Sequence, residues 1–499
     1  MPALSRASWW AVAIAAAACG SPPLPAPSPG AAAPPVTSAR LSAADVRADL
    51  TQLYTTLQHA HYDLYARASR RDYDALYAAT RAAVTRPESP LEVALQLQRF
   101  VAFGKVAHAR IDAIYDAFDR YTAAGGASFP LRFRVAGGRA YVTDNRSGVA
   151  AIERGDELVA LDGEPIARWI DRTARDESGD TPYLARALME RDFAALLWLE
   201  IGPAARFTVA VRRGARALVE VTVRARTAAE QDAAAGAQPP LLALDRTARI
   251  ARIAGPRLAY LRPGPFYNAD RSATDPYDPS AFRRFIDGAF TEFLAAGAAA
   301  LVIDLRDNPG GDSSFSDLMV GWFADRPLAF ASSFRIRVSE QAITSNQQRI
   351  ALAPGDPRSA SRRFAAAYAR ARPGDVIAFD VPSASPHPAP RFTGRVYLLI
   401  NRHSNSNTVA VAALVQDHKL GTILGEETSD LATTYGAMET FTLDHSRLVV
   451  GFPKAYIVRP SGDLTPRGVV PDIAIETPIV ETADDPVLQR ALAIASQSR

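Results

Sequence analysis

The chain has 499 residues, of which 48% are hydrophobic and 22% charged, a composition typical of a globular protein. At about 150 residues for each domain, this length predicts roughly three domains with cores of their own. The net charge of +3 is spread along the chain without a long basic run, which excludes nucleic acid as an expected partner. The only cysteine, Cys19, leaves no intramolecular disulfide, cysteine metal cluster or catalytic thiol for the folded body.

The first 41 residues predict export rather than folded structure. An apolar run with the length of a signal-peptide core follows Arg6, and it ends in small residues before Cys19. This ending resembles the lipobox of bacterial lipoproteins, so residues 1–19 are expected to be a signal peptide and Cys19 a lipidation site. Ordinary signal-peptide cleavage, which would remove Cys19, is the alternative. Residues 20–41 are rich in proline and alanine and predict a tether.

Apolar residues next recur at helical spacing, as in Val46, Leu50 and Leu53, and predict several packed helices over residues 42–124. Short β-type runs follow over residues 125–226 and predict a small β-rich domain. Its segment SGVAAIERGDELVALDGEPI resembles the PDZ modules of bacterial proteases, which bind peptides, often by their C-terminal carboxylate. The alternative is a module that only packs against its neighbours.

Beyond a polar stretch that predicts a linker at 227–248, strand-like runs alternate with helical ones, which predicts an α/β core over residues 249–480. The segment Ser280–Ala295 is a predicted crossover helix, and residues 481–499 predict a C-terminal helix. Buried strands are expected at 258–261, 299–305, 396–400, 420–424 and 448–452.

Three segments of the predicted core carry sequence motifs. In DLRDNPGGDSS, a strand runs into Gly310 and Gly311, whose backbone N–H groups could face an anion, although such a pair is more often only a turn. In INRHSNSNTVAVAALVQDHK, a strand delivers Ser406 to the start of a helix, where a serine is usually an N-cap. The third, GVVPDIAIETP, predicts another strand.

In this order, and together with YLRPGPF and LGEETSDLATTYGA, the segments resemble the tail-specific, or C-terminal processing, serine peptidases, which include the tricorn core protease. The resemblance implies that Ser406, eleven residues before the Asp of the Gln416-Asp417 pair, is the nucleophile. It implies that the backbone N–H groups of Gly310, Gly311 and Asn407 stabilise the oxyanion. It implies a polypeptide substrate and no cofactor or metal.

The general base departs from the usual pattern of the family. Leu431 stands where Ser-Lys members carry lysine, twenty-five residues beyond the serine. The segment RFVAFGKVAHARIDA is similar to that of the histidine-dependent, tricorn-like branch, so His108 is expected to be the base. That branch has a serine before its histidine and a glutamate near the final motif, where this chain has Ala107 and approximately Thr465.

Other residues are candidates for the roles of the lysine, serine and glutamate that this chain lacks. Glu427, with Glu426 and Asp112 as alternatives, is expected to supply an orienting carboxylate. Lys105 and Lys454 are reserve bases, since Lys419 lies too far along the helix from Ser406.

The sequence therefore predicts a multidomain α/β protein with a helical N-terminal region, a PDZ-like domain and a peptidase core. The expected function is that of an exported serine endopeptidase, anchored by lipid in the bacterial cell envelope on a periplasmic or extracellular face. It would cleave extended or C-terminal polypeptide segments through an acyl-enzyme at Ser406. A catalytically impaired peptide- or ligand-binding lipoprotein and a small ester or amide hydrolase are the alternatives.

Overall fold

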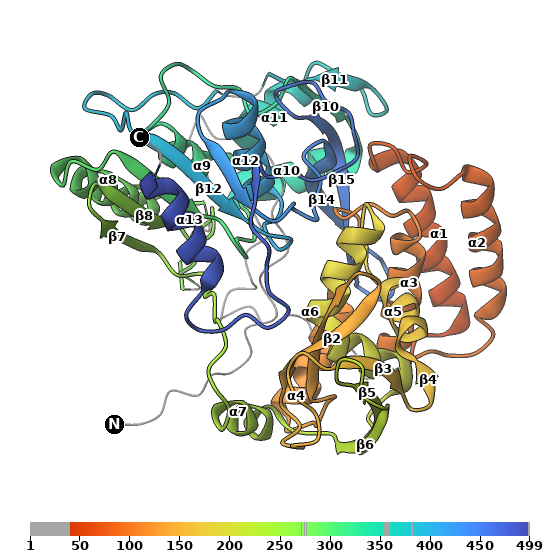
Figure 1. Ribbon diagram of the computed structural model, residues 1–499. Helices are drawn as coiled ribbons and strands as arrows, with labels where there is room; N and C mark the ends of the chain where they lie inside the picture. The colour runs from red at the N-terminus through yellow and green to blue at the C-terminus, as the bar shows by residue number, and fades with distance from the viewer. Residues whose placement is uncertain are drawn as a thin grey trace.

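The computed structural model describes residues 40–270, 272–273, 275, 277–352, 360–380 and 383–497 (Figure 1). The predicted signal peptide, the lipidation site Cys19 and nearly all of the predicted tether lie outside these residues. Among the helices that the structure describes, none is both long and apolar enough to cross a membrane.

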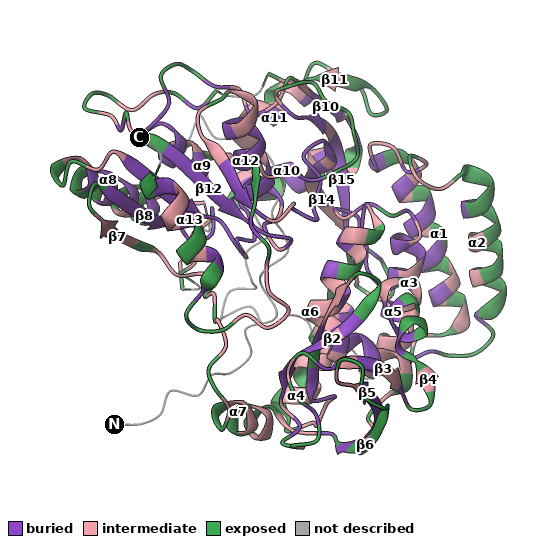
Figure 2. Cartoon of the chain, viewed as in Figure 1, coloured by how far each residue is buried: buried purple, intermediate pink, exposed green. Residues whose placement is uncertain are grey.

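The N-terminal region is helical, as the sequence predicts. Its helices are α1 (Ala43–Ala60), α2 (Arg70–Ala83), α3 (Pro90–Ala102) and α4 (Ala113–Ala123). The first three begin after Ser42, Ser69 and Ser89, whose hydroxyls each accept a backbone N–H of the first turn. Helix α2 lies at the outer edge of the molecule and is largely exposed (Figure 2), whereas α1 and α3 bury an apolar stripe against the core.

Residues 125–226, which we call the mixed domain, contain an antiparallel sheet in the order β1-β2-β3-β5-β6, with β4 paired to β3. Phe129, Phe133 and Phe193 meet edge to face in its core. The sequence misses the longest element, α6, which follows a Thr181 cap and Pro182. The elements are β1 (Leu131–Ala136), β2 (Arg139–Asn145), β3 (Glu157–Leu161), β4 (Glu164–Pro165), α5 (Ile166–Ala174), α6 (Pro182–Ile201), β5 (Arg206–Arg212) and β6 (Val219–Arg224).

Two boundaries differ in detail from the expected layout. Helix α4 packs on α6, with Tyr121 stacked on Trp198, so the end of the helical region contributes to the mixed domain. The stretch expected as a linker contains α7 (Ala228–Gly236), which starts in a capping box of Thr227 and Glu230.

The core sheet has the order β16-β13-β12-β9-β8-β7, and all neighbours are parallel except β7 and β8. Successive side chains of a strand point to opposite faces, so each face has its own cover. Helices α8, α9 and α12 share one apolar cluster with the sheet, and α13 shares the other (Figure 1). The elements are β7 (Ile250–Gly255), β8 (Leu258–Arg262), α8 (Ser280–Ala295), β9 (Ala300–Asp304), α9 (Ser313–Val320), β12 (Arg395–Ile400), α12 (Asn407–Asp417), β13 (Thr422–Gly425), β16 (Ile473–Ala474) and α13 (Pro486–Gln497).

A second, antiparallel sheet stands beside the core sheet in the order β11-β10-β15-β14. The run at 448–452, expected as a strand of the α/β core, belongs to β15 of this sheet. The strand expected in GVVPDIAIETP is reduced to the two-residue β16, because Pro471 has no N–H for a ladder. The elements are β10 (Ser333–Arg337), α10 (Glu340–Leu352), α11 (Ala360–Tyr368), β11 (Val376–Ala378), β14 (Thr434–Thr442) and β15 (Val449–Val458).

Candidate active site

The site begins where β9 and β12 end. These strands are parallel neighbours, so the loops that follow them leave the same edge of the sheet. Asn401 joins the two loops, since its amide donates to Asp307 Oδ1 at 2.8 Å and its Oδ1 accepts the Asp307 N–H at 3.1 Å. The Ser404 hydroxyl donates to the Leu305 carbonyl at 2.8 Å. The Gly-Gly motif and the serine motif are thereby fixed to each other.

Ser406 stands immediately before α12 in a conformation that L residues rarely adopt, with φ 53° and ψ −124°. Its hydroxyl makes no capping hydrogen bond to the helix, which separates it from the serines before α1, α2 and α3. Its backbone N–H donates to Asp430 Oδ2 at 2.6 Å. Such strain costs on the order of 1–3 kcal/mol and is concentrated in functional sites.

The glycine turn packs directly against Ser406. A Cβ on Gly310 would lie 2.9 Å from Ser406 Cβ and 2.8 Å from the Asn407 nitrogen, and a Cβ on Gly311 would lie 2.1 Å from the Phe266 carbonyl oxygen. Both positions also have positive φ, at 93° and 144°. Only glycine therefore fits this turn.

The expected oxyanion donors differ in their hydrogen bonds. The Gly310 N–H donates to Asn308 Oδ1 at 3.0 Å, and the Gly310 carbonyl accepts the Phe266 N–H at 2.9 Å. In a trans peptide the N–H points away from the carbonyl. The Gly311 N–H is therefore directed away from Phe266, whereas the Gly310 N–H is already bonded to Asn308.

His108 lies in the turn between α3 and α4 and is 4% exposed. Three contacts fix that turn. The Ala107 N–H donates to Asp180 Oδ2 at 3.0 Å, and the Ile111 N–H donates to Gln98 Oε1 at 2.6 Å. Arg110 and Gly451 of β15 exchange backbone hydrogen bonds of 3.2 and 2.8 Å. Helices and strands far apart in sequence thus hold the histidine.

A cavity of about 60 Å³ brings Ser406 and His108 together. Its lining comes from the core, the N-terminal helices and the mixed domain, with Ile111, Leu184 and Leu188 as apolar walls. The other lining residues are Gln98, Ala107, Arg110, Asp112, Tyr115, Glu177, Ser178, Arg191, Pro309, Asn405 and Asp430.

Glu177, which lines the cavity, has a pKa shifted in favour of its protonated form. Burial, with the nearby charge of Asp192, raises the pKa of Glu177 to about 8, and its Oε1 accepts the Tyr115 hydroxyl hydrogen at 2.6 Å. The wall therefore presents less negative charge than its composition suggests.

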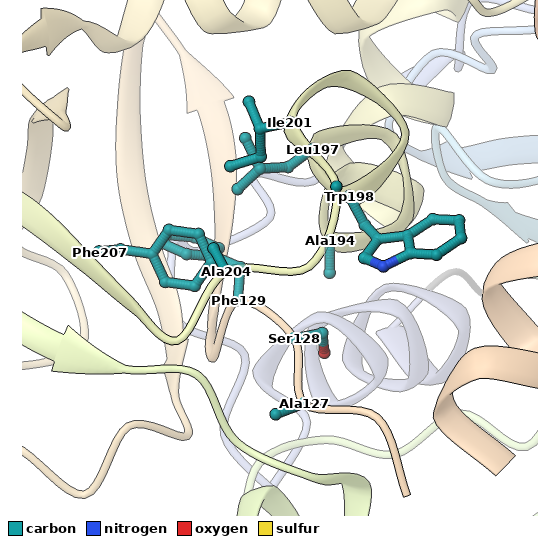
Figure 3. A pocket seen from close by; sticks show the side chains of 10 residues that line it. Ala127, Ser128, Phe129, Ala194, Leu197, Trp198, Ile201, Ala204 and Phe207 are labelled. Atoms are coloured by element: carbon teal, nitrogen blue, oxygen red, sulfur yellow. The ribbon is translucent and has the colours of Figure 1, made fainter. Parts of the chain in front are cut away.

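A second hollow, of about 10 Å³, lies within the mixed domain and is shown in Figure 3. Phe129, Leu197, Trp198 and Phe207 line it, and Ser128 is its one hydroxyl. It has room for about one water molecule, and none of its lining side chains could serve as a general base.

Of the other candidate residues, Asp112 lines the cavity, whereas Glu427, Lys105 and Lys454 do not. Glu427 pairs with Arg467 at 2.8 Å on a partly exposed surface and is not in the cavity wall. Lys105 is exposed. The ammonium of Lys454 is buried against Glu439 at 2.5 Å, and burial lowers its pKa to about 8. Neither lysine lines the cavity.

Two buried carboxylates contact the segments of Ser406 and His108 and are not predicted from the sequence. Asp430 stands in LGEETSDLATTYGA and Asp180 in the mixed domain. No sequence spacing relates either residue to Ser406, so only the structure shows that they lie near the site.

Comparisons with known proteins concern the fold and the sequence family. The model of peptidase family S41 matches residues 279–475. A structure described as mature CPAF complexed with lactacystin is 16% identical, with a TM-score of 0.62 over 91% of this chain and 96% of that chain. Mature CPAF alone is 17% identical, with a TM-score of 0.60 over 91% and 95%.

The photosystem II D1 C-terminal processing protease matches with 16% identity and a TM-score of 0.40, over 86% of this chain and 93% of that chain. Comparison with curated protein sequences finds no match. At these identities the CPAF structures show a shared fold, and the PDZ character of the mixed domain is not confirmed by them. Residues 279–475 thus match the model of peptidase family S41, and the motifs of this segment resemble those of the tail-specific serine peptidases.

Proposed function

We propose that the protein is an exported serine endopeptidase that cleaves extended or C-terminal polypeptide segments through an acyl-enzyme at Ser406. The observation that carries the proposal is the shared cavity of Ser406 and His108 beside the glycine turn. Acyl transfer requires a nucleophile, a general base and hydrogen-bond donors for the oxyanion. Ser406, His108 and the glycine turn would supply these parts.

In the proposed reaction, His108 accepts the hydroxyl proton of Ser406 while Oγ bonds to the scissile carbonyl carbon. The N–H groups of Gly311 and Asn407 stabilise the oxyanion, and each such donor contributes about 10² to 10³ in rate. His108 then gives its proton to the leaving amine as the C–N bond breaks. Water, deprotonated by the same histidine, releases the acyl group from Ser406.

The expected location rests on the sequence alone. The signal peptide ending at Cys19 supports export and lipid anchoring in the cell envelope. Peptide binding by the mixed domain, including capture of a C-terminus, is part of the same proposal and rests on the SGVAAIERGDELVALDGEPI segment.

The test is degradation of an unfolded reporter protein by purified residues 20–499, with Ser406→Ala prepared in parallel. Cleavage by the wild type and none by the variant is the expected result. If two folded preparations leave the reporter intact, the endopeptidase proposal fails and a binding protein becomes the better account.

A second candidate is a hydrolase of small esters or amides. It would use the same nucleophile and base, with the apolar wall of Ile111, Leu184 and Leu188 beside a small acyl group. Hydrolysis of p-nitrophenyl acetate that depends on Ser406, without degradation of the reporter, would favour that alternative.

A further inference from the structure

Asp430 is a buried carboxylate whose contacts are made with backbone. It lies in the loop between β13 and β14 and is 5% exposed. Oδ2 accepts the Ser406 N–H at 2.6 Å, and Oδ1 accepts the N–H of Leu431 at 2.8 Å. The Asp430 carbonyl accepts the hydroxyl hydrogen of Thr428 at 2.9 Å. The carboxylate is therefore fixed, and it fixes the residue at which the backbone is strained.

Asp180 has the corresponding relation to the histidine. It lies in the loop between α5 and α6 and is 4% exposed. Its Oδ2 accepts the N–H of Ala107, the residue before His108, at 3.0 Å. Its Oδ1 lies 3.3 Å from a guanidinium nitrogen of Arg67, which follows α1. One carboxylate thus joins the mixed domain, the N-terminal helices and the turn of the histidine.

The two carboxylates are close enough to affect each other. Burial and the charge of Asp430 raise the pKa of Asp180 to about 7, against the opposite effects of Arg67 and the Ala107 N–H. Burying two carboxylates that repel each other costs free energy, and groups perturbed in this way are concentrated at functional sites.

We propose that Asp180 and Asp430 are a pair of positioning carboxylates, in which Asp430 holds the backbone of Ser406 and Asp180 holds the turn of His108. The inference rests on the proposed function of the dyad. In this proposal neither carboxylate contacts the reacting atoms. Each acts through the residue that it positions. They supply an alternative to the orienting role expected of Glu427, which pairs with Arg467 instead.

The test uses Asp430→Ala, Asp180→Ala and the near-isosteric Asp430→Asn in the full chain. The matched control is Asp49→Ala, which removes an equally buried carboxylate that accepts the N–H groups of His445 and Ser446 at 3.0 and 2.7 Å. Peptide kcat and KM are measured with the rate at which a fluorophosphonate labels Ser406. Melting temperatures accompany each variant.

We expect both alanine variants of the pair to lose about 10²-fold in kcat and in labelling rate with KM within threefold, since a displacement of about 1 Å costs that much. Asp430→Asn retains an acceptor for the Ser406 N–H and should recover part of the loss. Asp49→Ala should lower the melting temperature and leave kcat and labelling unchanged.

Two outcomes overturn the inference. One is wild-type labelling in folded Asp430→Ala and Asp180→Ala. The other is a loss of labelling in Asp49→Ala as large as in the pair, which would reduce the effect to stability. If Asp430→Ala does not fold, wild-type labelling in folded Asp180→Ala overturns it. A wild type that is neither labelled nor active contradicts the proposed function itself, and is thereby distinguished from these results.

Discussion

At the scale of single residues, Ser406 combines a strained backbone conformation with its proposed role as the nucleophile. With φ 53° and ψ −124°, this position suits glycine better than any residue with a Cβ. Serine is nevertheless present, and the N–H to Asp430 and the packing of Gly310 hold it there. A residue with a Cβ in such a conformation indicates that its side chain is needed for function.

Ser406→Ala and Ser406→Gly separate these effects. Both variants should lose turnover by 10³-fold or more, because neither has a hydroxyl to attack the carbonyl. Ser406→Gly should melt at a higher temperature than Ser406→Ala, since only glycine relieves strain of about 1–3 kcal/mol. Peptidase assays and thermal unfolding measure the two effects. A higher melting temperature for Ser406→Ala would contradict the strain argument.

Glu177 predicts how stability depends on pH. Its pKa is about 8 in the folded protein and near 4.5 when unperturbed, so folding favours the protonated form. The stabilisation is complete below pH 4.5 and is lost as the pH rises through 8. Glu177→Gln should therefore show a smaller fall in the free energy of unfolding between pH 5 and pH 8.5, by about 1 kcal/mol or more.

Denaturant unfolding at several pH values measures this difference. Parallel curves for wild type and Glu177→Gln would show that the glutamate is already ionised in the folded protein. Glutamine keeps a carbonyl acceptor for the Tyr115 hydroxyl, so the comparison isolates the charge.

At the scale of elements, the glycine turn depends on its contact with the segment before α8. Gly311 and Phe266 form a parallel bridge, and the Asp312 N–H donates to the Phe266 carbonyl at 2.7 Å. A side chain at Gly311 would occupy the place of that carbonyl. The turn and the segment at 266 must therefore move apart if Gly311 is replaced.

Gly311→Ala should abolish peptidase activity and lower the melting temperature more than Gly297→Ala. Gly297 also has positive φ, at 64°, but nothing lies within 4 Å of a Cβ there. The control thus carries only the backbone strain, about 1–2 kcal/mol. Equal melting temperatures and retained activity in Gly311→Ala would show that the turn can open without harm.

Several elements could be predicted because local sequence determines them. Helix α8 occupies the predicted range, since Phe282, Ile286 and Phe293 repeat on one face. Helix α6 and the pairing of the second sheet could not be predicted, for different reasons. The first carries apolar residues around its circumference, and the strands of the second pair over more than a hundred residues, as β10 does with β15.

For the site, the motif residues and the resemblance to a family could be predicted from the sequence, but the supporting groups could not. Ser406, Gly310 and Gly311 follow strands in recognisable patterns. Asp180 lies more than two hundred residues from Ser406 and reaches the site by the packing of another domain. No periodicity in the sequence reports such a contact, so the sequence points to Glu427 as the orienting carboxylate although Glu427 pairs with Arg467.

At the scale of the whole molecule, Arg402 joins the core to the mixed domain. It follows β12, and its guanidinium lies 3.0 Å from Glu190 of α6 and 2.8 Å from Glu426. Its guanidinium also stacks on Tyr183, and a second arginine, Arg134 of β1, reaches Glu426 at 2.8 Å. The ion pairs lie close to the loop of the nucleophile, so the two parts of the chain are stabilised together.

Arg402→Met should lower the free energy of unfolding by about 3–5 kcal/mol, because it leaves buried carboxylates without their main partner. Arg86→Met, which removes an exposed pair with Glu92, should melt close to wild type. Calorimetry and denaturant unfolding provide the comparison. Similar small losses in both variants would mean that the junction contributes little.

The most direct measurement of the central claim is the rate at which a fluorophosphonate labels the wild type, His108→Ala and Lys105→Ala, with the modified residue located by peptide mass spectrometry. We predict one adduct at Ser406, formed at the wild-type rate in Lys105→Ala and about 10²-fold or more slowly in His108→Ala. An adduct at another residue, no adduct in folded wild type, or unchanged labelling of His108→Ala would contradict the account.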